Sequence, residues 1–312
     1  MKKTVKFMLT AVMAITCACG AAACGGNVEK NITVVAREQG SGTREAFDKV
    51  VTDGTHYLEE KDENGSKVYN TTLSASIQTK TGTVMTSVAN DKNAIGYISL
   101  GSVDDTIKVV TVEGVAPSAQ TVLDGSYKIQ RPFVIMTNAT VTLTERAADF
   151  MNYLYSSKME THSETAGCIF LEDPAMRANE GKEGIAVGTY EKLESLPAGD
   201  KIVIRGSTSM ENLINQAAKG YADEYAVDAT TIFDIQLEGS SVGRKAVEDD
   251  TKGNVIGLSS ASVNQDNVNS FNVCLDAVAV IVNKENTGIN NLTLHQLYDI
   301  FSGKITKFSE IQ

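Results

Sequence analysis

The fold is decided by one stretch near the N-terminus, Val34-Val35-Ala36-Arg37-Glu38-Gln39-Gly40-Ser41-Gly42-Thr43-Arg44-Glu45-Ala46-Phe47. Its first part belongs to an apolar, β-branched run, residues 32–36, which predicts a strand. Residues 44–51 predict a helix, and the glycines and serine between the two predict a tight turn. A strand, a Gly/Ser turn and a helix in this order are typical of α/β folds.

The same alternation continues along the chain and predicts an α/β fold with parallel strands. Further strands are expected at residues 94–100, 108–112, 201–204, 231–237, 255–258 and 277–282. Helices are expected to end at residues 87–90 and to span residues 146–157, 210–221, 244–249 and 293–301. Polar composition predicts an exposed loop or hairpin at residues 53–70 and a connector at residues 172–200.

The Gly/Ser turn occurs twice more, as Gly206-Ser207-Thr208-Ser209 and as Gly239-Ser240-Ser241-Val242-Gly243. A helix start carries unpaired N–H groups and the positive end of the helix dipole. Glycine lets a ligand approach the backbone, and hydroxyls add donors, so three converging turns predict an oxyanion site. Arg37 adds a fixed charge and a bidentate fork. Each turn taken alone also fits an ordinary capped helix.

The N-terminus is typical of an exported protein. Lys2, Lys3 and Lys6 precede an apolar run at residues 7–23, which is short for a spanning helix and indicates a signal peptide. Ala21-Ala22-Ala23-Cys24 resembles a lipobox, which predicts lipidation of Cys24 and a tether at residues 24–31. The alternative is a plain signal peptide cut after Ala23.

Composition narrows the function classes. The 312 residues, less the signal at residues 1–23, suffice for two domains, and no later segment is apolar enough for a second membrane span. A formal net charge of −11 argues against nucleic acid as a partner. The histidines and the cysteines Cys168 and Cys274 show no metal-ligand spacing, so no metal or other cofactor is expected. The two cysteines either pair or remain free.

The stretch around Arg37 resembles the R-x-x-G-S-G-T-x-x-x-F motif of the phosphate-binding proteins of ABC transporters (PstS type). Ala94-Ile95-Gly96-Tyr97-Ile98-Ser99-Leu100 is similar to that family's A-I-G-Y-x-S-L strand. Gly114, Tyr127 and Arg131 match its G…Y…R stretch. Further matches cover the turns at residues 206–210 and 239–243, the segment 256–260, the strand at 276–283 and the helix at 297–308.

The order of these motifs differs from the family's, in which the turn at 206–210 comes first and the R-x-x-G-S-G-T strand follows the last helix. The resemblance therefore implies a circularly permuted, two-lobe periplasmic-binding-protein-like α/β fold of type II. One lobe would be split between residues 32–99 and 276–312, and the other would be continuous over residues 100–275. Hinge crossings are expected near residues 97–100 and 274–277.

The resemblance also implies a ligand set and a role. Inorganic phosphate would be held by Arg37, Ser41, Gly42 and Thr43 on one lobe and by Ser209, Met210 (through its N–H), Ser240 and Ser260 on the other. Some relatives have Asp at the position of Ser260, which weakens the expectation of selectivity against sulfate. The protein would be a non-enzymatic lipoprotein outside the cytoplasm that passes phosphate unchanged to an ABC permease.

Three alternatives remain open. The first is a receptor for another oxyanion, such as sulfate, molybdate or tungstate. The second is a permuted relative that has lost its ligand and acts as a surface or sensor protein. The third is a serine hydrolase, because Gly239–Gly243 also fits G-x-S-x-G and places Ser241 before Asp276 and His295 in the Ser…Asp…His order.

Overall fold

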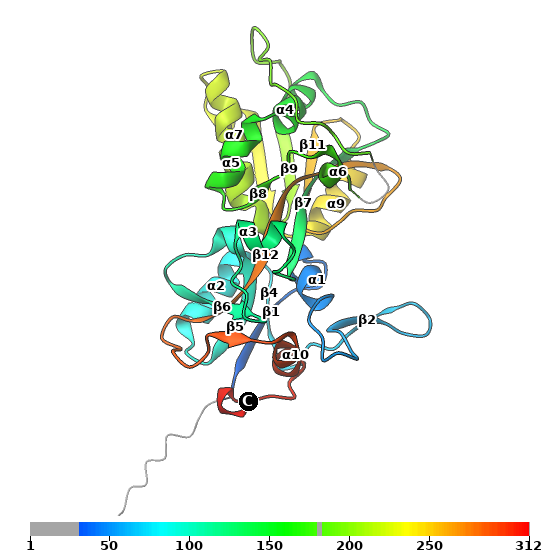
Figure 1. The fold of residues 1–312 in the computed structure, drawn as a ribbon. Coiled ribbons are helices and arrows are strands. Elements are labelled where there is room, and N and C mark those ends of the chain that lie inside the picture. Colours follow the sequence, from blue (N-terminus) through cyan, green and yellow to red (C-terminus); the bar gives the residue numbers. More distant parts are fainter. Residues whose placement is uncertain (1–30, 180–182, 312) are drawn as a thin grey trace, which may run out of the picture.

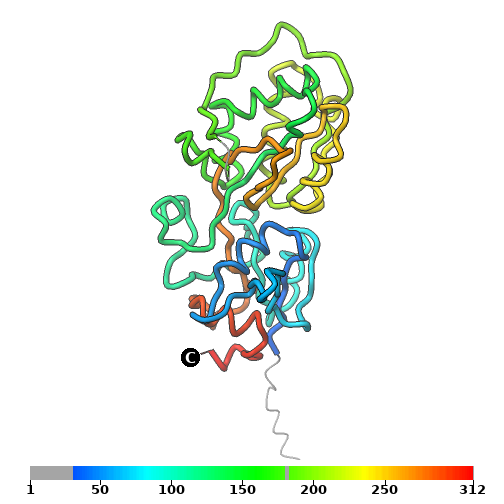
Figure 2. The backbone as a smooth tube through the Cα atoms, turned by 90° about the vertical axis from the view of Figure 1, so that its right-hand side faces the viewer, coloured from blue at the N-terminus to red at the C-terminus, as the bar shows by residue number. Residues whose placement is uncertain are grey.

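The computed structural model describes residues 31–179 and 183–311, which form two α/β lobes joined at a waist (Figures 1 and 2). The predicted signal peptide, Cys24 and most of the tether lie outside the described residues. Among the helices in the described part of the chain, none is long and apolar enough to cross a bilayer.

The lower lobe in Figure 1 contains residues 32–129 and 278–311 and is called the split lobe. Its strands are β1 (Thr33–Arg37), β4 (Ser76–Gln78), β5 (Ala94–Ser99), β6 (Ile107–Val112) and β13 (Asn291–Leu292). Its helices are α1 (Gly42–Asp48), α2 (Thr81–Asn90), α3 (Ala119–Leu123) and α10 (Leu294–Ser302), with 3-10 turns at Leu100–Ser102 and Phe308–Glu310. The predicted hairpin is present as β2 (Glu59–Lys61) and β3 (Lys67–Tyr69) and projects sideways.

The upper lobe contains residues 130–277 and is called the continuous lobe. Its strands are β7 (Gln130–Asn138), β8 (Ile169–Phe170), β9 (Ile202–Gly206), β10 (Phe233–Leu237) and β11 (Val255–Ser259). Its helices are α4 (Glu145–Tyr155), α5 (Lys158–Thr165), α6 (Pro174–Arg177), α7 (Glu211–Glu224), α8 (Ala229–Ile232) and α9 (Ser240–Glu248), with a 3-10 turn at Thr208–Met210.

One long strand, β12 (Val268–Asn283), runs through both lobes. Its first part pairs with β7 as far as Ala277, and its last part pairs with β5 and β6 from Val278 onward. The resulting strand order is β10-β9-β11-β7-β12-β5-β1-β4. The strands therefore form a path with β12 near its middle and with β10 and β4 at its two ends.

The lobe boundary differs from the expected one. Val110, Val122, Tyr127 and Ile129 pack in the hydrophobic core of the split lobe, so residues 107–129 belong to that lobe and not to the continuous one. The strand at residues 107–112 joins the split lobe because its partner is the second half of β12. The crossings thus lie at the start of β7 and within β12; the latter agrees with the crossing expected near residues 274–277, whereas residues 97–100 are not a crossing.

The two ends of the described chain lie side by side. Ile32 donates its N–H to the carbonyl oxygen of Thr306 over 2.7 Å, which joins the start of β1 to the segment after α10. Figure 1 shows the chain entering β1 next to the C-terminus at the base of the split lobe. The first strand therefore occupies the place where a chain leaving α10 would naturally continue.

Local sequence explains most elements, and each predicted strand and helix overlaps an observed one. In α10, for example, Thr293 and Gln296 form a capping box, and Gly303 ends the helix with a φ of 83°. The expectation of parallel strands holds for β1, β4, β5, β9, β10 and β11 among themselves. It is wrong for β7 and β12, which are antiparallel to their neighbours.

Candidate functional site

Residues at the ends of four strands meet between the lobes. Arg37 ends β1, the loop after it leads into α1, and the loops after β9, β10 and β11 face it from the continuous lobe. Every residue of the predicted ligand set is buried there. The structure thus brings together one polar group, called the inter-lobe cluster, that consists of Arg37, Ser41, Gly42, Thr43, Ser209, Met210, Ser240 and Ser260.

Hydroxyl groups connect the three loops of the continuous lobe. Ser207 donates to the Ser260 hydroxyl over 2.8 Å, and the Ser240 and Ser260 hydroxyl oxygens lie 3.3 Å apart. The backbone N–H of Ser260 also donates to the Ser240 hydroxyl, over 3.1 Å. Loops far apart in the sequence therefore present their donors at one place.

Two of the hydrogen bonds that cross between the lobes involve the turn at residues 40–43. The hydroxyl oxygens of Thr43 and Ser209 lie 2.9 Å apart, and both side chains are buried. The N–H of Ser241 donates to the carbonyl oxygen of Gly40 over 3.3 Å. Because each bond joins a loop of the split lobe to a loop of the continuous lobe, the structure shows the two lobes closed on each other.

Gly42 marks a close contact between the lobes. A Cβ atom at this position would lie 2.5 Å from the Ser260 carbonyl carbon and 2.6 Å from its carbonyl oxygen. Real Cβ atoms do not approach backbone this closely, so only glycine permits this degree of closure. The G-S-G-T turn therefore needs its second glycine for contact with the opposite lobe.

The guanidinium of Arg37 is held in a fixed orientation. Its Nε and Nη2 donate to the Glu38 carboxylate over 2.9 and 3.0 Å, and to the carbonyl oxygens of Gln78 and Thr79, each over 3.3 Å. Nη1 has one partner of a different kind, the Thr81 hydroxyl at 3.5 Å. Nε and Nη2 are thus bound by acceptors of the split lobe, whereas Nη1 faces the hydroxyl groups between the lobes.

The buried ion pair of Arg44 and Asp48 lies next to Arg37 and holds its backbone in place. Arg44 donates from Nη1 to the Arg37 carbonyl oxygen over 2.9 Å and from Nε to Asp48 over 2.9 Å. Burial raises the pKa of Asp48 to about 6, against the opposing effect of Arg44. The Tyr97 hydroxyl, whose ring stacks on Phe47, accepts from the Arg37 N–H. Both contacts fix the backbone of Arg37 at the end of β1.

One predicted donor has a different partner in this structure. The N–H of Met210 was expected to face the ligand, but it donates to the carbonyl oxygen of Ser207 over 3.2 Å. The neighbouring N–H of Ser209 donates to the Ser207 hydroxyl. These bonds belong to the tight turn that precedes α7.

Sequence reasoning missed three members of the site. Thr81 contacts Arg37, and its hydroxyl lies 3.1 Å from that of Thr208 and 3.4 Å from that of Ser209. Ser207 bridges to Ser260, and Glu38 orients Arg37. Thr81 begins α2 after the short strand β4, so Thr81-Gly82-Thr83 is a fourth strand–turn–helix unit that the sequence contained.

The hydrolase alternative fails on geometry. Asp276 is bonded to Arg131 and Ser99, and His295 pairs with Asp299 on an exposed face of α10. Ser241 hydrogen bonds through its N–H to Gly40 and has no contact with His295 or Asp276. The three residues therefore do not form a Ser–His–Asp triad.

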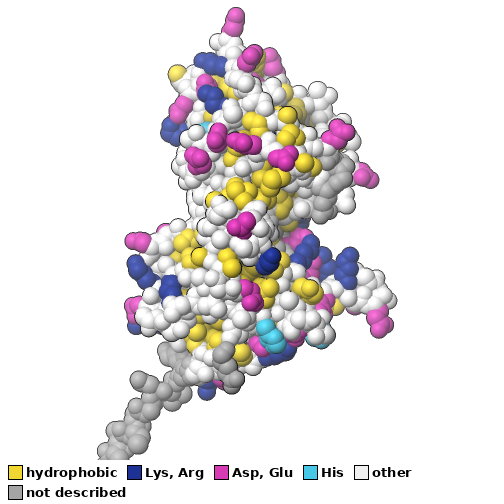
Figure 3. All heavy atoms as spheres, viewed as in Figure 1, with side chains coloured by type: hydrophobic (Ala, Val, Ile, Leu, Met, Phe, Trp, Pro, Cys, Tyr) yellow, Lys and Arg dark blue, Asp and Glu magenta, His cyan; other side chains and the backbone are white. Residues whose placement is uncertain are grey.

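The described residues provide few other candidate sites. In residues 31–179 and 183–311, no group of three or more His, Cys, Asp or Glu is arranged to hold a metal ion. Cys168 and Cys274 are both buried and free. On the face drawn in Figure 3, basic and acidic side chains are scattered over both lobes and do not form one basic surface.

Comparisons with known proteins identify the family of this chain. The family model of the PBP superfamily domain matches residues 18–158 and 193–311. The chain is 33% identical over 300 residues to "Phosphate-binding protein PstS 2" of Streptococcus pneumoniae serotype 4. This alignment covers 95% of this chain and 93% of the relative. The chain is 32% identical over 284 residues to the protein of the same name from Streptococcus agalactiae serotype V, covering 90% of this chain and 87% of the relative.

A solved structure gives the same result. The crystal structure of a phosphate ABC transporter, phosphate-binding protein from Streptococcus pneumoniae TIGR4 matches with a TM-score of 0.62 and 32% identity, covering 90% of this chain and all of that one. Since the alignments run through nearly the whole of both chains, the streptococcal relatives share the motif order of this chain. The chain belongs to the PBP superfamily and, within it, to the PstS-type family of phosphate-binding proteins.

Proposed function

We propose that this protein binds inorganic phosphate in the inter-lobe cluster, outside the cytoplasm, and delivers it to the permease of an ABC transporter. One observation carries the proposal. Loops from both lobes place hydroxyl groups within 2.8–3.4 Å of one another, and the Thr81 hydroxyl lies 3.5 Å from the oriented guanidinium of Arg37. A hydroxyl can exchange its bond to another hydroxyl for one to an anion, and a tetrahedral oxyanion accepts several such bonds at once.

The cluster suits an anion that is bound and released unchanged. The carboxylate of Glu38 balances the charge of Arg37, so the remaining attraction comes from hydroxyls, backbone N–H groups and the starts of α1 and α9. The hydroxyl groups of the cluster bond to one another. None of these bonds is to a histidine or lysine that could activate a hydroxyl as a nucleophile. This chemistry supports binding and not catalysis.

The N-terminal sequence and the relatives support the proposed cellular placement. The segment before Cys24 has the features of an export signal, and a lipidated Cys24 would tether the protein through the segment 24–31. The relatives are named phosphate-binding proteins, and the matched structure is that of a phosphate ABC transporter component. Delivery of phosphate to a permease at the membrane accounts for both the N-terminal tether and the likeness to these relatives.

Ser260 favours one second candidate, a receptor with broader oxyanion specificity. A hydroxyl accepts the proton of hydrogen phosphate, but unlike a carboxylate it does not repel fully ionised anions such as sulfate. The Ser260 hydroxyl already accepts from Ser207, and the carboxylate of Glu38 is bonded to Arg37. Selectivity for phosphate would therefore rest on a neutral acceptor.

We also propose that the chain order arose by circular permutation. Permutation is tolerated where the original ends are adjacent at the surface. The hydrogen bond between Ile32 and Thr306 supports this, since it places the present ends where a continuous chain would pass. The original ends would have been joined through the connector at residues 172–200.

The role of Arg37 offers a direct test. Replacement by Met keeps the aliphatic stem of the side chain and removes the guanidinium, including the Nη1 that faces the cluster, so phosphate affinity should fall about tenfold to a hundredfold, or roughly 1.5–3 kcal/mol. Equilibrium dialysis with labelled phosphate on residues 25–312 measures this loss. Arg146→Met is the matched control, because Arg146 bonds to the carbonyl oxygens of Pro197 and Asp200, away from the cluster. Equal affinities of both variants and the wild type would refute the assignment.

A further inference from the structure

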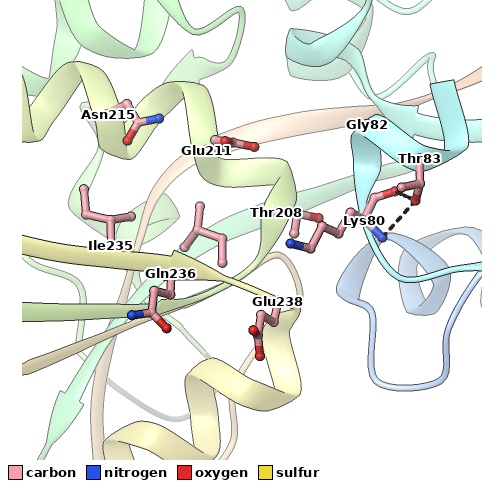
Figure 4. A pocket seen from close by; sticks show the side chains of 10 residues that line it. Lys80, Gly82, Thr83, Thr208, Glu211, Asn215, Ile235, Gln236 and Glu238 are labelled. Carbon is pink, nitrogen blue, oxygen red and sulfur yellow. Dashed lines mark hydrogen bonds between the residues drawn. The ribbon is translucent and has the colours of Figure 1, made fainter. Parts of the chain in front are cut away.

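A groove of about 610 Å³ opens beside the inter-lobe cluster. The split lobe lines it with Lys80, Gly82 and Thr83 at the start of α2. The continuous lobe lines it with Thr208 and Glu211 and with the end of β10 (Figure 4). Because Thr208 is buried and also contacts Thr81, this residue separates the groove from the cluster.

Thr81 and Thr208 are joined by two hydrogen bonds across the lobes. The N–H of Thr81 donates to the Thr208 hydroxyl over 3.3 Å, and the two hydroxyl oxygens lie 3.1 Å apart. On the inner side, the Thr81 hydroxyl lies 3.4 Å from that of Ser209 and 3.5 Å from Nη1 of Arg37. The pair therefore faces the groove on one side and the anion-binding groups on the other.

The distance of the groove from the hinge determines when the Thr81–Thr208 contact forms during closure. Strand β4, which precedes α2, and strand β10 lie at opposite ends of the strand path, whereas β12 crosses between the lobes near its middle. Hinge opening at β12 widens the inter-lobe gap most at the positions furthest from the crossing. The Thr81–Thr208 contact is thus among the last to form on closure and the first to break on opening.

We propose that Thr81 and Thr208 form a latch that retains the bound anion, and that the groove outside this latch is the route by which the anion enters and leaves. The inference rests on the proposed function and adds to it a residue, Thr81, that determines the release rate. A latch that forms after the anion has entered lowers the dissociation rate and leaves the association rate unchanged.

Lys80 serves the entry step. It is the one basic residue among those that line the groove, and Glu211 and Glu238 line it from the continuous lobe. In Figure 4 its side chain extends from the start of α2 toward the loop that carries Thr208. The charged lining residues are one lysine and two glutamates, so removal of the Lys80 charge leaves only negative charge at this entrance and should lower the encounter rate with an anion.

The latch is tested by comparing Thr81→Val with Thr86→Val. Both changes replace a hydroxyl by a methyl on the same helix, but Thr86 is exposed and its hydroxyl donates to the Gly82 carbonyl oxygen of that helix. Labelled phosphate bound to residues 25–312 is chased with unlabelled phosphate, and its release is timed by rapid filtration. Thr81→Val should release phosphate about tenfold faster, with an unchanged association rate, and Thr86→Val should match the wild type.

Two further variants separate a latch from a general structural role. Thr208→Val removes both bonds of the pair, including the one from the Thr81 N–H, and should accelerate release at least as much as Thr81→Val. The effects of the two single variants should not add in the double variant, because both changes act on the same contact. Thermal unfolding without phosphate should be the same for Thr81→Val and Thr86→Val. A wild-type release rate for Thr81→Val, or additive effects in the double variant, would overturn the latch.

The route is tested through the association rate. Lys80→Gln should slow phosphate association roughly fivefold at low ionic strength and lose this effect in high salt. Lys128→Gln has the same net charge and changes an exposed residue bonded to Gly125, so it should associate like the wild type. Equal rates for the two variants would overturn the route. A wild-type protein that retains no phosphate would instead refute the proposed function itself.

Discussion

Arg131 and Asp276 form a fully buried ion pair at the waist, with 2.9 Å between Nη2 and Oδ2. Nε of Arg131 donates to the same oxygen over 3.1 Å, and the Ser99 hydroxyl donates to the other carboxylate oxygen over 2.9 Å. Arg131 lies on β7, Ser99 ends β5, and Asp276 lies on β12 beside its crossing point. One carboxylate therefore ties together three strands that belong to both lobes.

Removal of one partner of this ion pair should lower the free energy of unfolding. Burial raises the pKa of Asp276 and lowers that of Arg131, so each charge depends on the other. Asp276→Leu leaves Arg131 charged and buried without a partner and should lower the free energy of unfolding by about 3–5 kcal/mol. The double variant Arg131→Met/Asp276→Leu removes both charges and should recover most of this loss. Urea unfolding measures all three, and losses that simply add would contradict a coupled pair.

Closure should depend on the absence of a side chain at Gly42. Gly42→Ala places a Cβ atom against the backbone of Ser260 and prevents the lobes from closing fully. Phosphate affinity should fall at least tenfold, or about 1.4 kcal/mol, while the thermal stability of the ligand-free protein stays unchanged. Gly82→Ala is the control, since a Cβ there would meet no atom within 4 Å. Normal affinity of Gly42→Ala would show that this contact is not needed for binding.

Asp48 should make stability depend on pH. Its pKa is about 6 in the folded protein, above the ordinary value of 3.8, so the folded state binds more protons than the unfolded state between these values. This contribution is fully present below pH 3.8 and is lost as pH rises through 6. The wild type should gain about 2 kcal/mol of unfolding free energy between pH 7 and pH 4.5 relative to Asp48→Asn.

Urea titrations of both proteins at the two pH values measure this difference. Because the other carboxylates are common to both proteins, their contributions cancel in the comparison. If the two proteins change equally between pH 7 and pH 4.5, the pKa of Asp48 is not raised in the folded state.

The parts of the fold that local pattern determines were predictable. The three Gly/Ser turns that open helices are set by neighbouring residues, and the structure places all three between the lobes. Strand β7 was not predicted, because Pro132 within it argues against a central strand. In the first half of β12, polar residues and a cysteine interrupt the apolar ones, so the sequence pattern does not indicate a strand. Only the pairing of this segment with β7 identifies it as one.

The lobe boundary and the latch required information that no local pattern contains. Residues 107–112 belong to the split lobe because they pair with residues 280–283, about 170 positions later in the chain. Thr81 was missed because its preceding strand, β4, has three residues and gives no periodic signal. Its role emerges only when closure brings it against Thr208.

The central claim is tested most directly by calorimetric titration of residues 25–312 with phosphate and, in parallel, with sulfate. The account predicts phosphate binding with a dissociation constant near or below about 1 µM, or roughly −8 kcal/mol. Sulfate should bind about tenfold more weakly, because it lacks the proton that Ser240 or Ser260 would accept. Equal binding of both anions would mean a general oxyanion receptor. No heat with phosphate from a folded protein would contradict the account.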